Sequence, residues 1–157
     1  MKSISAFLMT VLLVACGSSD PKTLVSDGHK AQGSGDSKTA EAKFTEALEE
    51  LKPGDALYIE AKLGRIEALI AKDAKLAKDE FLTLAASTDM VGEKDFTYIG
   101  GQLVSAHKYL EALDLVHKGI QRAGGESPAL MVQIERIKKE AAADAAVGKE
   151  LASLGYL

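Results

Sequence analysis

Hydrophobic residues recur along most of the chain at intervals of three and four, the spacing that places them on one side of an α-helix. Ala40, Phe44 and Ala47 follow this spacing, and no stretch alternates between apolar and polar residues for long enough to predict a strand. Ser127 and Pro128 are typical of a helix start, a capping hydroxyl followed by proline at the first helical position. The pattern predicts an all-α fold of eight helices, at 21–32, 37–51, 56–71, 74–86, 93–106, 109–123, 128–142 and a last one ending near residue 154.

The helical pattern also repeats. Gly28, Gly64 and Gly100 stand 36 residues apart, and each is followed by a small residue and then a bulky one. These pairs are Ala40 and Phe44, Ala77 and Phe81, and Ala112 and Val116, with the middle pair one residue late. A small residue on each of two antiparallel helices lets the helices approach closely, and the bulky residue fills the next gap. The repeat therefore predicts stacked helix pairs, an α-solenoid.

The first fifteen residues differ from the rest of the chain. Lys2 gives a positively charged start, and residues 4–15 form an apolar run that is too short to span a bilayer but suits an export signal. The run ends in Leu13, Val14, Ala15 and Cys16, which resembles the lipobox of bacterial lipoproteins. This resemblance implies cleavage before Cys16 and acylation of its thiol, whereas the alternative is an ordinary signal cut after Ala15 that leaves a free thiol.

The repeat pattern resembles the tetratricopeptide repeat family. In the first unit Gly28, Ala40, Phe44, Ala47 and Pro53 match the family's small, small, aromatic, small and proline positions. The third unit matches through a set of residues on both of its predicted helices: Phe96, Ile99, Gly100, Tyr109 and Ala112. The units are longer than the usual 34 residues, so positions carried over from the family can shift by one. An unrelated helical bundle with accidental spacing is the alternative.

Together the two resemblances divide the chain into four parts. We expect a lipoprotein signal peptide at 1–15, a lipidated cysteine and short tether at 16–20, and three tetratricopeptide-like repeats at 21–128. Residues 129–157 are expected to form a C-terminal capping helix pair, in which Leu151, Leu154, Tyr156 and Leu157 either close the stack or dock on another chain.

Composition and charge narrow the function classes. The chain is 46% hydrophobic and 27% charged, a balance typical of one folded globular domain, and its net charge is −4. A negatively charged chain lacks the general electrostatic footprint of nucleic-acid binding. We therefore expect no nucleic-acid partner.

Candidate catalytic and metal-binding residues are few. Asp114 and His117 lie three apart on one predicted helix face, but two ligands without a cysteine or second histidine make a poor metal site. His107 lies at a predicted helix boundary, where a solvated or capping role is the default. Neither a phosphate-binding glycine loop nor a nucleophile elbow is present in the sequence. The sequence predicts no catalytic residue, no metal, no cofactor and no enzyme.

The family resemblance implies a concave binding groove lined by the first helix of each unit. Projected onto this chain, the family register places seven candidate partner-binding residues there: Val25, His29, Gln32, Tyr58, Arg65, Lys94 and Thr97. The same register places the smaller Ala61, Ala68, Gly101 and Val104 near that surface. Tyr58 and Arg65 are the leading contacts, because tyrosine and arginine are over-represented among residues that dominate binding energy. The chain contains no asparagine, which argues against the carboxylate clamp of the family's chaperone-binding members.

We therefore expect a lipid-anchored adaptor in the bacterial cell envelope that binds an envelope protein through the groove and the membrane through its N-terminal lipid. Gly17 after the cysteine, rather than aspartate, favours the outer membrane, with the domain facing the periplasm. The alternative is a lipoprotein that binds a small ligand or a glycan, against which the absence of tryptophan argues mildly. An enzyme with residues scattered over several helices is a second alternative.

Overall fold

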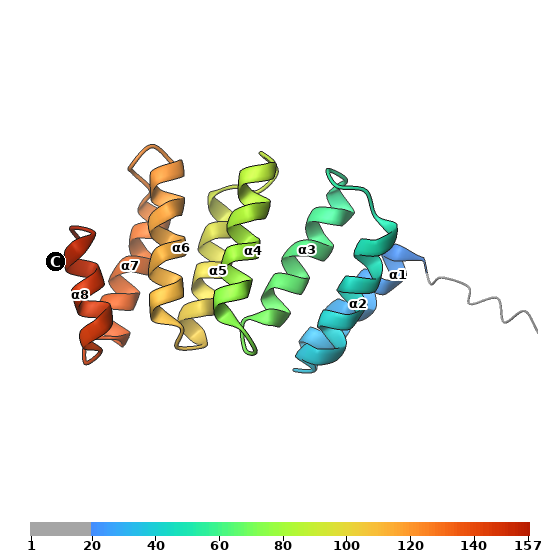
Figure 1. Cartoon of the computed structure of the whole chain (residues 1–157), viewed down its shortest axis with the longest axis horizontal. Coiled ribbons are helices and arrows are strands. Elements are labelled where there is room, and N and C mark those ends of the chain that lie inside the picture. Colours follow the sequence, from blue (N-terminus) through green and yellow to red (C-terminus); the bar gives the residue numbers. More distant parts are fainter. Residues whose placement is uncertain (1–19) are drawn as a thin grey trace, which may run out of the picture.

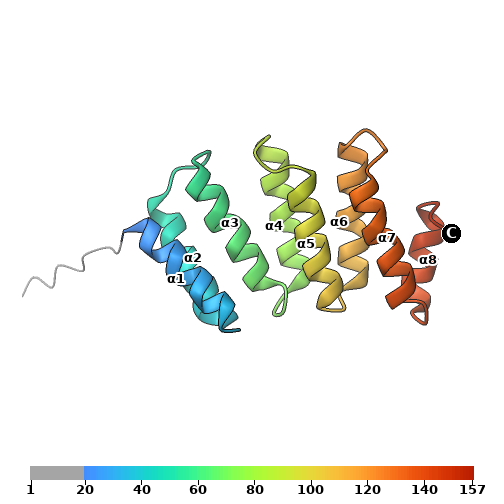
Figure 2. The ribbon, with the colours of Figure 1, turned by 180° about the vertical axis from the view of Figure 1, so that it is seen from behind.

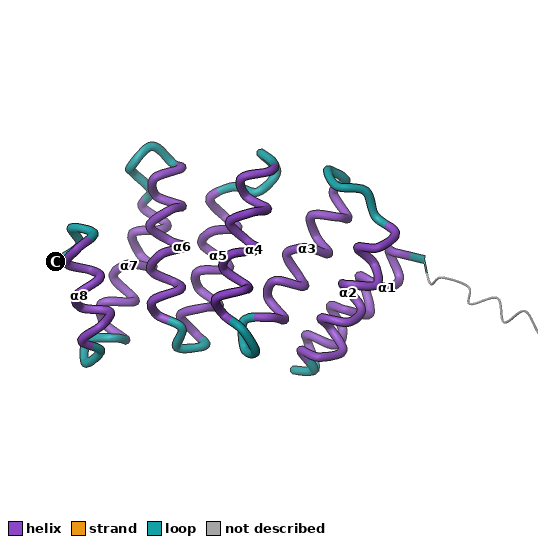
Figure 3. The backbone as a smooth tube through the Cα atoms, viewed as in Figure 1, coloured by secondary structure: helices purple, strands orange, loops and turns teal. Residues whose placement is uncertain are grey.

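The computed structural model describes residues 20–157, which form eight α-helices and no strand (Figures 1 and 3). The helices are α1 (Pro21–Gly33), α2 (Ser37–Glu50), α3 (Ala56–Leu69), α4 (Ala74–Ser87), α5 (Glu93–Ser105), α6 (Tyr109–Arg122), α7 (Pro128–Glu140) and α8 (Ala145–Ser153). The predicted all-α class is confirmed, and the predicted helix boundaries agree with the structure within two residues. The proposed signal peptide and Cys16 lie outside the described residues. None of the described helices is long and apolar enough to cross a membrane.

Side-chain caps fix the starts of several helices. Asp20, Asp36 and Asp73 each accept a hydrogen bond from a backbone N–H in the first turn of α1, α2 and α4. Ser127 does the same for α7 from a buried position, and Asp144 for α8. These local signals explain why the helix starts were readable from the sequence.

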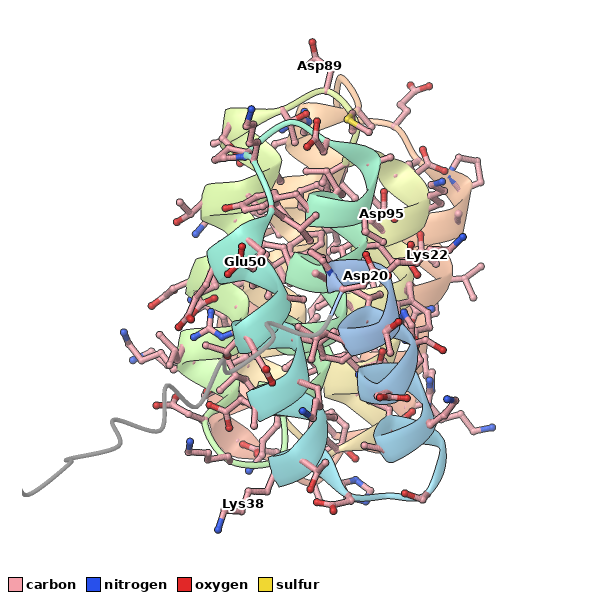
Figure 4. All side chains as sticks on the ribbon, turned by 90° about the vertical axis from the view of Figure 1, so that its right-hand side faces the viewer. Asp20, Lys22, Lys38, Glu50, Asp89 and Asp95 are labelled. Atoms are coloured by element: carbon pink, nitrogen blue, oxygen red, sulfur yellow. The ribbon has the colours of Figure 1, made fainter. Side chains whose placement is uncertain are left out.

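The helices stack side by side in two layers. Figure 1 looks onto the layer of α2, α4, α6 and α8, and Figure 2 onto the layer of α1, α3, α5 and α7. Contacts between layers join α1 to α2, α2 to α3, α5 to α6 and α6 to α7, and the last helix, α8, packs on α6. Figure 4 views the stack from its N-terminal end, where Lys22 and Lys38 point into solvent. The arrangement is that of a solenoid-like helical repeat.

Helix α3 separates two hydrophobic clusters. The smaller one, the N-terminal cluster, lies between α1, α2 and one side of α3 and contains Leu24, Val25, Ala31, Ala40, Phe44, Ala47, Ala61 and Ala68. The larger one, the main cluster, starts on the other side of α3 with Ile59, Ile66 and Leu69 and continues to Val147 and Leu151 of α8. Because residues 100° apart on a helix face different neighbours, one helix serves both clusters.

The glycines of the repeat make room for bulky side chains. A Cβ on Gly28 would lie 2.7 Å from Cε1 of Phe44, and one on Gly64 would lie 2.5 Å from its Cζ, so the Phe44 ring is held between α1 and α3. A Cβ on Gly100 would lie 2.8 Å from Cγ2 of Val116. The close helix crossings predicted from these small residues are present.

The middle unit departs from the predicted register. Gly28 and Gly100 face the second helix of their own unit, whereas Gly64 faces Phe44 in the unit before. Counted back twelve residues from Ala77, the position equivalent to Gly28 and Gly100 is Arg65. The 36-residue spacing therefore equated Gly64 with Gly28 and Gly100, although Gly64 lies on a different side of the first helix of its unit.

The C-terminal residues divide between packing and exposure. Leu151 is buried in the main cluster, and Leu154 and Tyr156 pack against it. The Tyr156 hydroxyl lies 2.8 Å from Nδ1 of His117 on α6, which fixes the chain end to the stack. Leu157 remains 74% exposed. Within this chain the last helix covers the end of the stack.

Candidate functional site

The surface formed by α1, α3, α5 and α7 (Figure 2) is here called the first-helix face. Polar side chains join its helices across units. On α1, Nδ1 of His29 lies 3.2 Å from Oε1 of Gln32, and its Nε2 lies 3.0 Å from Oε1 of Glu60 on α3. The amide of Gln32 donates a hydrogen bond of 2.9 Å to the carbonyl oxygen of Gly64. These contacts hold α1 and α3 at a fixed separation on this face.

Similar contacts continue toward the C-terminus. Tyr98 of α5, 51% exposed, lies near the Glu67 carboxylate of α3. Partial burial raises the pKa of the Tyr98 phenol, and the proximity of the Glu67 carboxylate raises it further. Arg136 of α7 reaches Oγ of Ser105 on α5 at 3.3 Å. Each first helix is thus tied to the next.

A hollow of about 300 Å³ opens on this face between α1, α3 and α5. Its polar lining includes Gln32, Glu67, Gln102 and Ser105, with Ile70 among the apolar atoms. Amide, carboxylate and hydroxyl groups offer both hydrogen-bond donors and acceptors, the mixture that orients a bound polar segment. Because these groups come from three helices, the hollow exists only in the folded stack.

The structure brings only part of the predicted groove together. His29 and Gln32 lie on the first-helix face as predicted. The placement of Tyr58 and Arg65 there is wrong, because both side chains face α4. Arg65 Nη1 lies 2.5 Å from Oε2 of Glu80 on α4. Tyr58 and Arg65 each precede Glu60 and Glu67 by two residues, about 200° around the helix, and therefore lie on the opposite side of α3. The register change described above turns that side toward α4.

Of the other predicted groove residues, Val25 differs from the prediction, whereas Lys94 and Thr97 remain accessible on α5. Val25 is buried in the N-terminal cluster and offers no surface to a partner. Thr97 donates a hydrogen bond of 2.9 Å to the Glu93 carbonyl of its own helix. Lys94 is exposed one turn before Tyr98. The smaller residues Ala61, Ala68 and Val104, projected near the groove, are also buried.

Four residues of this face were missed by the sequence reasoning: Glu60, Glu67, Tyr98 and Gln102. Two signals were present. Glu60 and Glu67 stand seven residues apart, which places them on one side of a helix, and Tyr98 is an aromatic residue between the buried Phe96 and Ile99. Neither signal tells which neighbouring helix that side faces.

Asp114, His117 and His107 each contact different partners. Asp114 pairs with Lys78 at 2.5 Å and Lys118 at 3.1 Å, whereas His117 contacts Tyr156 and Gln121. His107 lies beside Tyr109 in the turn after α5, with Nδ1 2.6 Å from the Tyr109 hydroxyl. Among residues 20–157 no group of three or more His, Cys, Asp or Glu side chains is placed to hold a metal ion.

Comparisons with known proteins return no relative: no family model, no curated protein and no solved structure matches the chain.

Proposed function

We propose that this chain is a lipid-anchored, non-enzymatic adaptor of the tetratricopeptide type, which binds an envelope protein through the first-helix face at the periplasmic side of the bacterial outer membrane. The single observation that carries the binding role is the polar hollow between α1, α3 and α5. Its side chains, Glu67 and Gln32 among them, already contact neighbouring helices. Such prior ordering lowers the entropy cost of binding a partner.

The anchor rests on the sequence around Cys16. Five residue steps separate Cys16 from Pro21, the first residue of α1, a distance of at most about 17 Å for an extended chain. Acylation at Cys16 would therefore keep the N-terminal end of the stack close to the membrane. More than one acyl chain is needed for durable attachment, because a single chain of this kind binds reversibly.

Site-directed photo-crosslinking in cells tests the binding surface. Benzoylphenylalanine replaces Tyr98 or Gln102 on the first-helix face, and Leu110 on α6 or Thr45 on α2 as controls on second helices. Tyr98 and Leu110 are well matched, because they are 51% and 44% exposed. We expect a defined envelope protein to be captured from Tyr98 and Gln102 only. Equal capture from all four positions, or none, would contradict an adaptor role for this face.

A separate experiment tests the anchor. The Cys16→Ser variant is expected to incorporate no labelled palmitate and to leave the membrane fraction, whereas the unchanged chain incorporates label and sediments with outer membranes. Palmitate incorporation by Cys16→Ser would show that the label lies elsewhere and would contradict the lipobox interpretation.

A small-ligand or glycan-binding role remains the alternative function. Tyr98, an aromatic side chain exposed on the first-helix face, is the observation that favours it. A glycan array tests the purified chain and its Tyr98→Ala variant. Glycan binding that is lost in Tyr98→Ala, together with no protein capture in cells, would support the alternative over the adaptor.

A further inference from the structure

A second hollow, of about 330 Å³, lies between α3 and α4, away from the first-helix face. Tyr58 and Lys62 of α3 line it, together with Leu76, Glu80 and Leu84 of α4. One part of the wall is therefore apolar and another carries charge. The adaptor proposed above makes no use of this hollow.

The sequence at this crossing differs from that of the first and third units. In the first and third units a glycine of the first helix lies against the second helix, at Gly28 and Gly100. The equivalent position in the middle unit is Arg65, whose side chain needs space between α3 and α4. The long guanidinium side chain takes the place of a hydrogen atom at this crossing, and it contacts Glu80, which lines the hollow.

The charges along this crossing do not balance. Lys62 Nζ lies 3.2 Å from Oε2 of Glu80, and Arg65 Nη1 lies 2.5 Å from the same oxygen. The side chains of Lys62, Arg65 and Glu80 are only 24%, 21% and 18% exposed. Two cations thus share one carboxylate in a largely desolvated place, where an uncompensated charge is costly.

Neighbouring carboxylates do not remove the excess. Asp79 also lines the hollow, but it pairs with Lys75 at 3.0 Å and with Lys78 at 3.4 Å. Lys78 in turn lies 2.5 Å from Asp114. This group of charged side chains between α3 and α4 therefore stays positive, whereas the net charge of the chain is −4. Arg65 lies closer to Glu80 than Lys62 does, and Nε of Arg65 is buried without a hydrogen-bond partner.

We propose that the hollow between α3 and α4 binds a carboxylate carried on a small apolar group, with Lys62 pairing to the carboxylate and Leu76 and Leu84 contacting the apolar part. Arg65 neutralises Glu80 and so leaves the Lys62 ammonium group for the ligand. A free small acid and the C-terminal residue of a polypeptide share this chemistry. The inference is independent of the adaptor function, because it uses the opposite side of α3.

Titration calorimetry on the full chain, purified in detergent, tests the proposal with N-acetyl-leucine and its uncharged analogue N-acetyl-leucinamide. We expect the acid to bind at least tenfold more tightly than the amide. A pentapeptide ending in leucine, with a free or an amidated C-terminus, distinguishes the two sources. Binding of the free-acid peptide alone assigns a chain terminus, and binding of both acids assigns the carboxylate group in general.

Two substitutions should move the affinity for the acid in opposite directions. Lys62→Gln is expected to lower it at least tenfold, and Lys62→Arg to retain it. Glu80→Gln is expected to raise it several-fold, because it releases Arg65 and Lys62 toward the ligand.

Lys43→Gln and Glu46→Gln are the matched controls. They change the charge equally within the ion pair of α2, whose Nζ–Oε2 distance is 3.0 Å, and should leave the affinity unchanged. Thermal unfolding of each variant shows that it is folded. No binding of either acid, equal binding of acids and amides, or an equal effect of Lys43→Gln and Lys62→Gln would overturn the proposal.

Discussion

The two hydrophobic clusters on either side of α3 reach close packing by different means. The N-terminal cluster is built from five alanines, Leu24, Val25 and one aromatic ring, that of Phe44. The main cluster also contains five alanines, but it adds many leucine, isoleucine and valine side chains from six helices and the rings of Phe81 and Phe96, which are in edge-to-face contact at 4.8 Å. One cluster relies on a single large side chain, whereas the other distributes its volume over many.

A helical repeat can thus vary the contacts between its helices without changing its architecture. Where both helices carry small residues, as at Gly28 and Ala40, the backbones approach and one ring fills the gap. Where Arg65 takes the glycine position, the helices of the unit enclose a hollow instead. The units differ in how closely their two helices pack, and not in whether the helices form.

The largest expected effect comes from removing the ring on which the N-terminal cluster depends. Phe44→Ala should lower the free energy of unfolding by about 3–5 kcal/mol, because the cavity lies among alanines that cannot collapse into it. Phe81→Ala should cost a similar amount. The two variants should differ in where they open, since repeats are stabilised mainly by their neighbours. Hydrogen exchange is expected to accelerate in α1 and α2 for Phe44→Ala, and equal acceleration throughout the stack would contradict separate clusters.

A smaller effect is expected from filling the space that the ring occupies. Gly64→Ala should destabilise the chain by about 1–3 kcal/mol, because the new methyl group would overlap the Phe44 ring. Gly148→Ala in α8 is the matched control. No atom lies within 4 Å of its added Cβ, so it should stabilise the chain by about 0.5–1 kcal/mol. In urea unfolding, combining Gly64→Ala with Phe44→Leu should recover part of the loss, and strict additivity of the two changes would argue against this contact.

The helix caps also differ between the first and third units. Asp36 caps α2 through a 3.0 Å hydrogen bond from the Thr39 N–H, and Asp36→Ala should cost about 1 kcal/mol. In the third unit Lys108 occupies the N-cap position of α6 without a side-chain cap. Lys108→Asp should therefore raise stability by about 1 kcal/mol, because it supplies an acceptor and removes a positive charge from the helix N-terminus. A lower midpoint of thermal unfolding for Lys108→Asp would show that Lys108 has another role.

The smallest expected effect is the pH dependence of the ion pair between α4 and α6. Desolvation raises the pKa of Asp114, but hydrogen bonds and charges of Lys78 and Lys118 outweigh it and hold the pKa below its usual value of 3.8. A carboxyl group whose pKa is lowered by folding stabilises the fold above its unfolded pKa, and this contribution is lost as the pH falls through the folded pKa.

Stability should therefore fall below about pH 4, and less so in Lys78→Gln. Urea unfolding at pH 6 and pH 3 measures the difference at low salt. Lys72→Gln, which removes a cation that is 68% exposed from the pair with Glu41, should retain the wild-type pH dependence. An identical pH dependence in Lys78→Gln and wild type would show that Lys78 does not perturb Asp114.

Much of the fold was predictable because its signals are local. The caps Asp36 and Ser127 and the spacing of Ala40, Phe44 and Ala47 depend only on residues within one or two helical turns. The candidate site was predicted less well. His29 and Gln32 lie on the first-helix face, but Tyr58 and Arg65 do not, because a one-residue change in register rotates a helix side by 100°.

Local patterns along the chain specify the eight helices of residues 20–157, where those helices begin and end, and which small residues permit close crossings. Each of these depends on neighbours along the chain, through hydrogen bonds of the backbone and the period of apolar residues. The tertiary structure decided which helix each face meets: Gly64 against Phe44, Arg65 against Glu80, and Glu67 against Tyr98. Those pairings depend on the rotation and separation of whole helices, which only the packing of all of them together fixes.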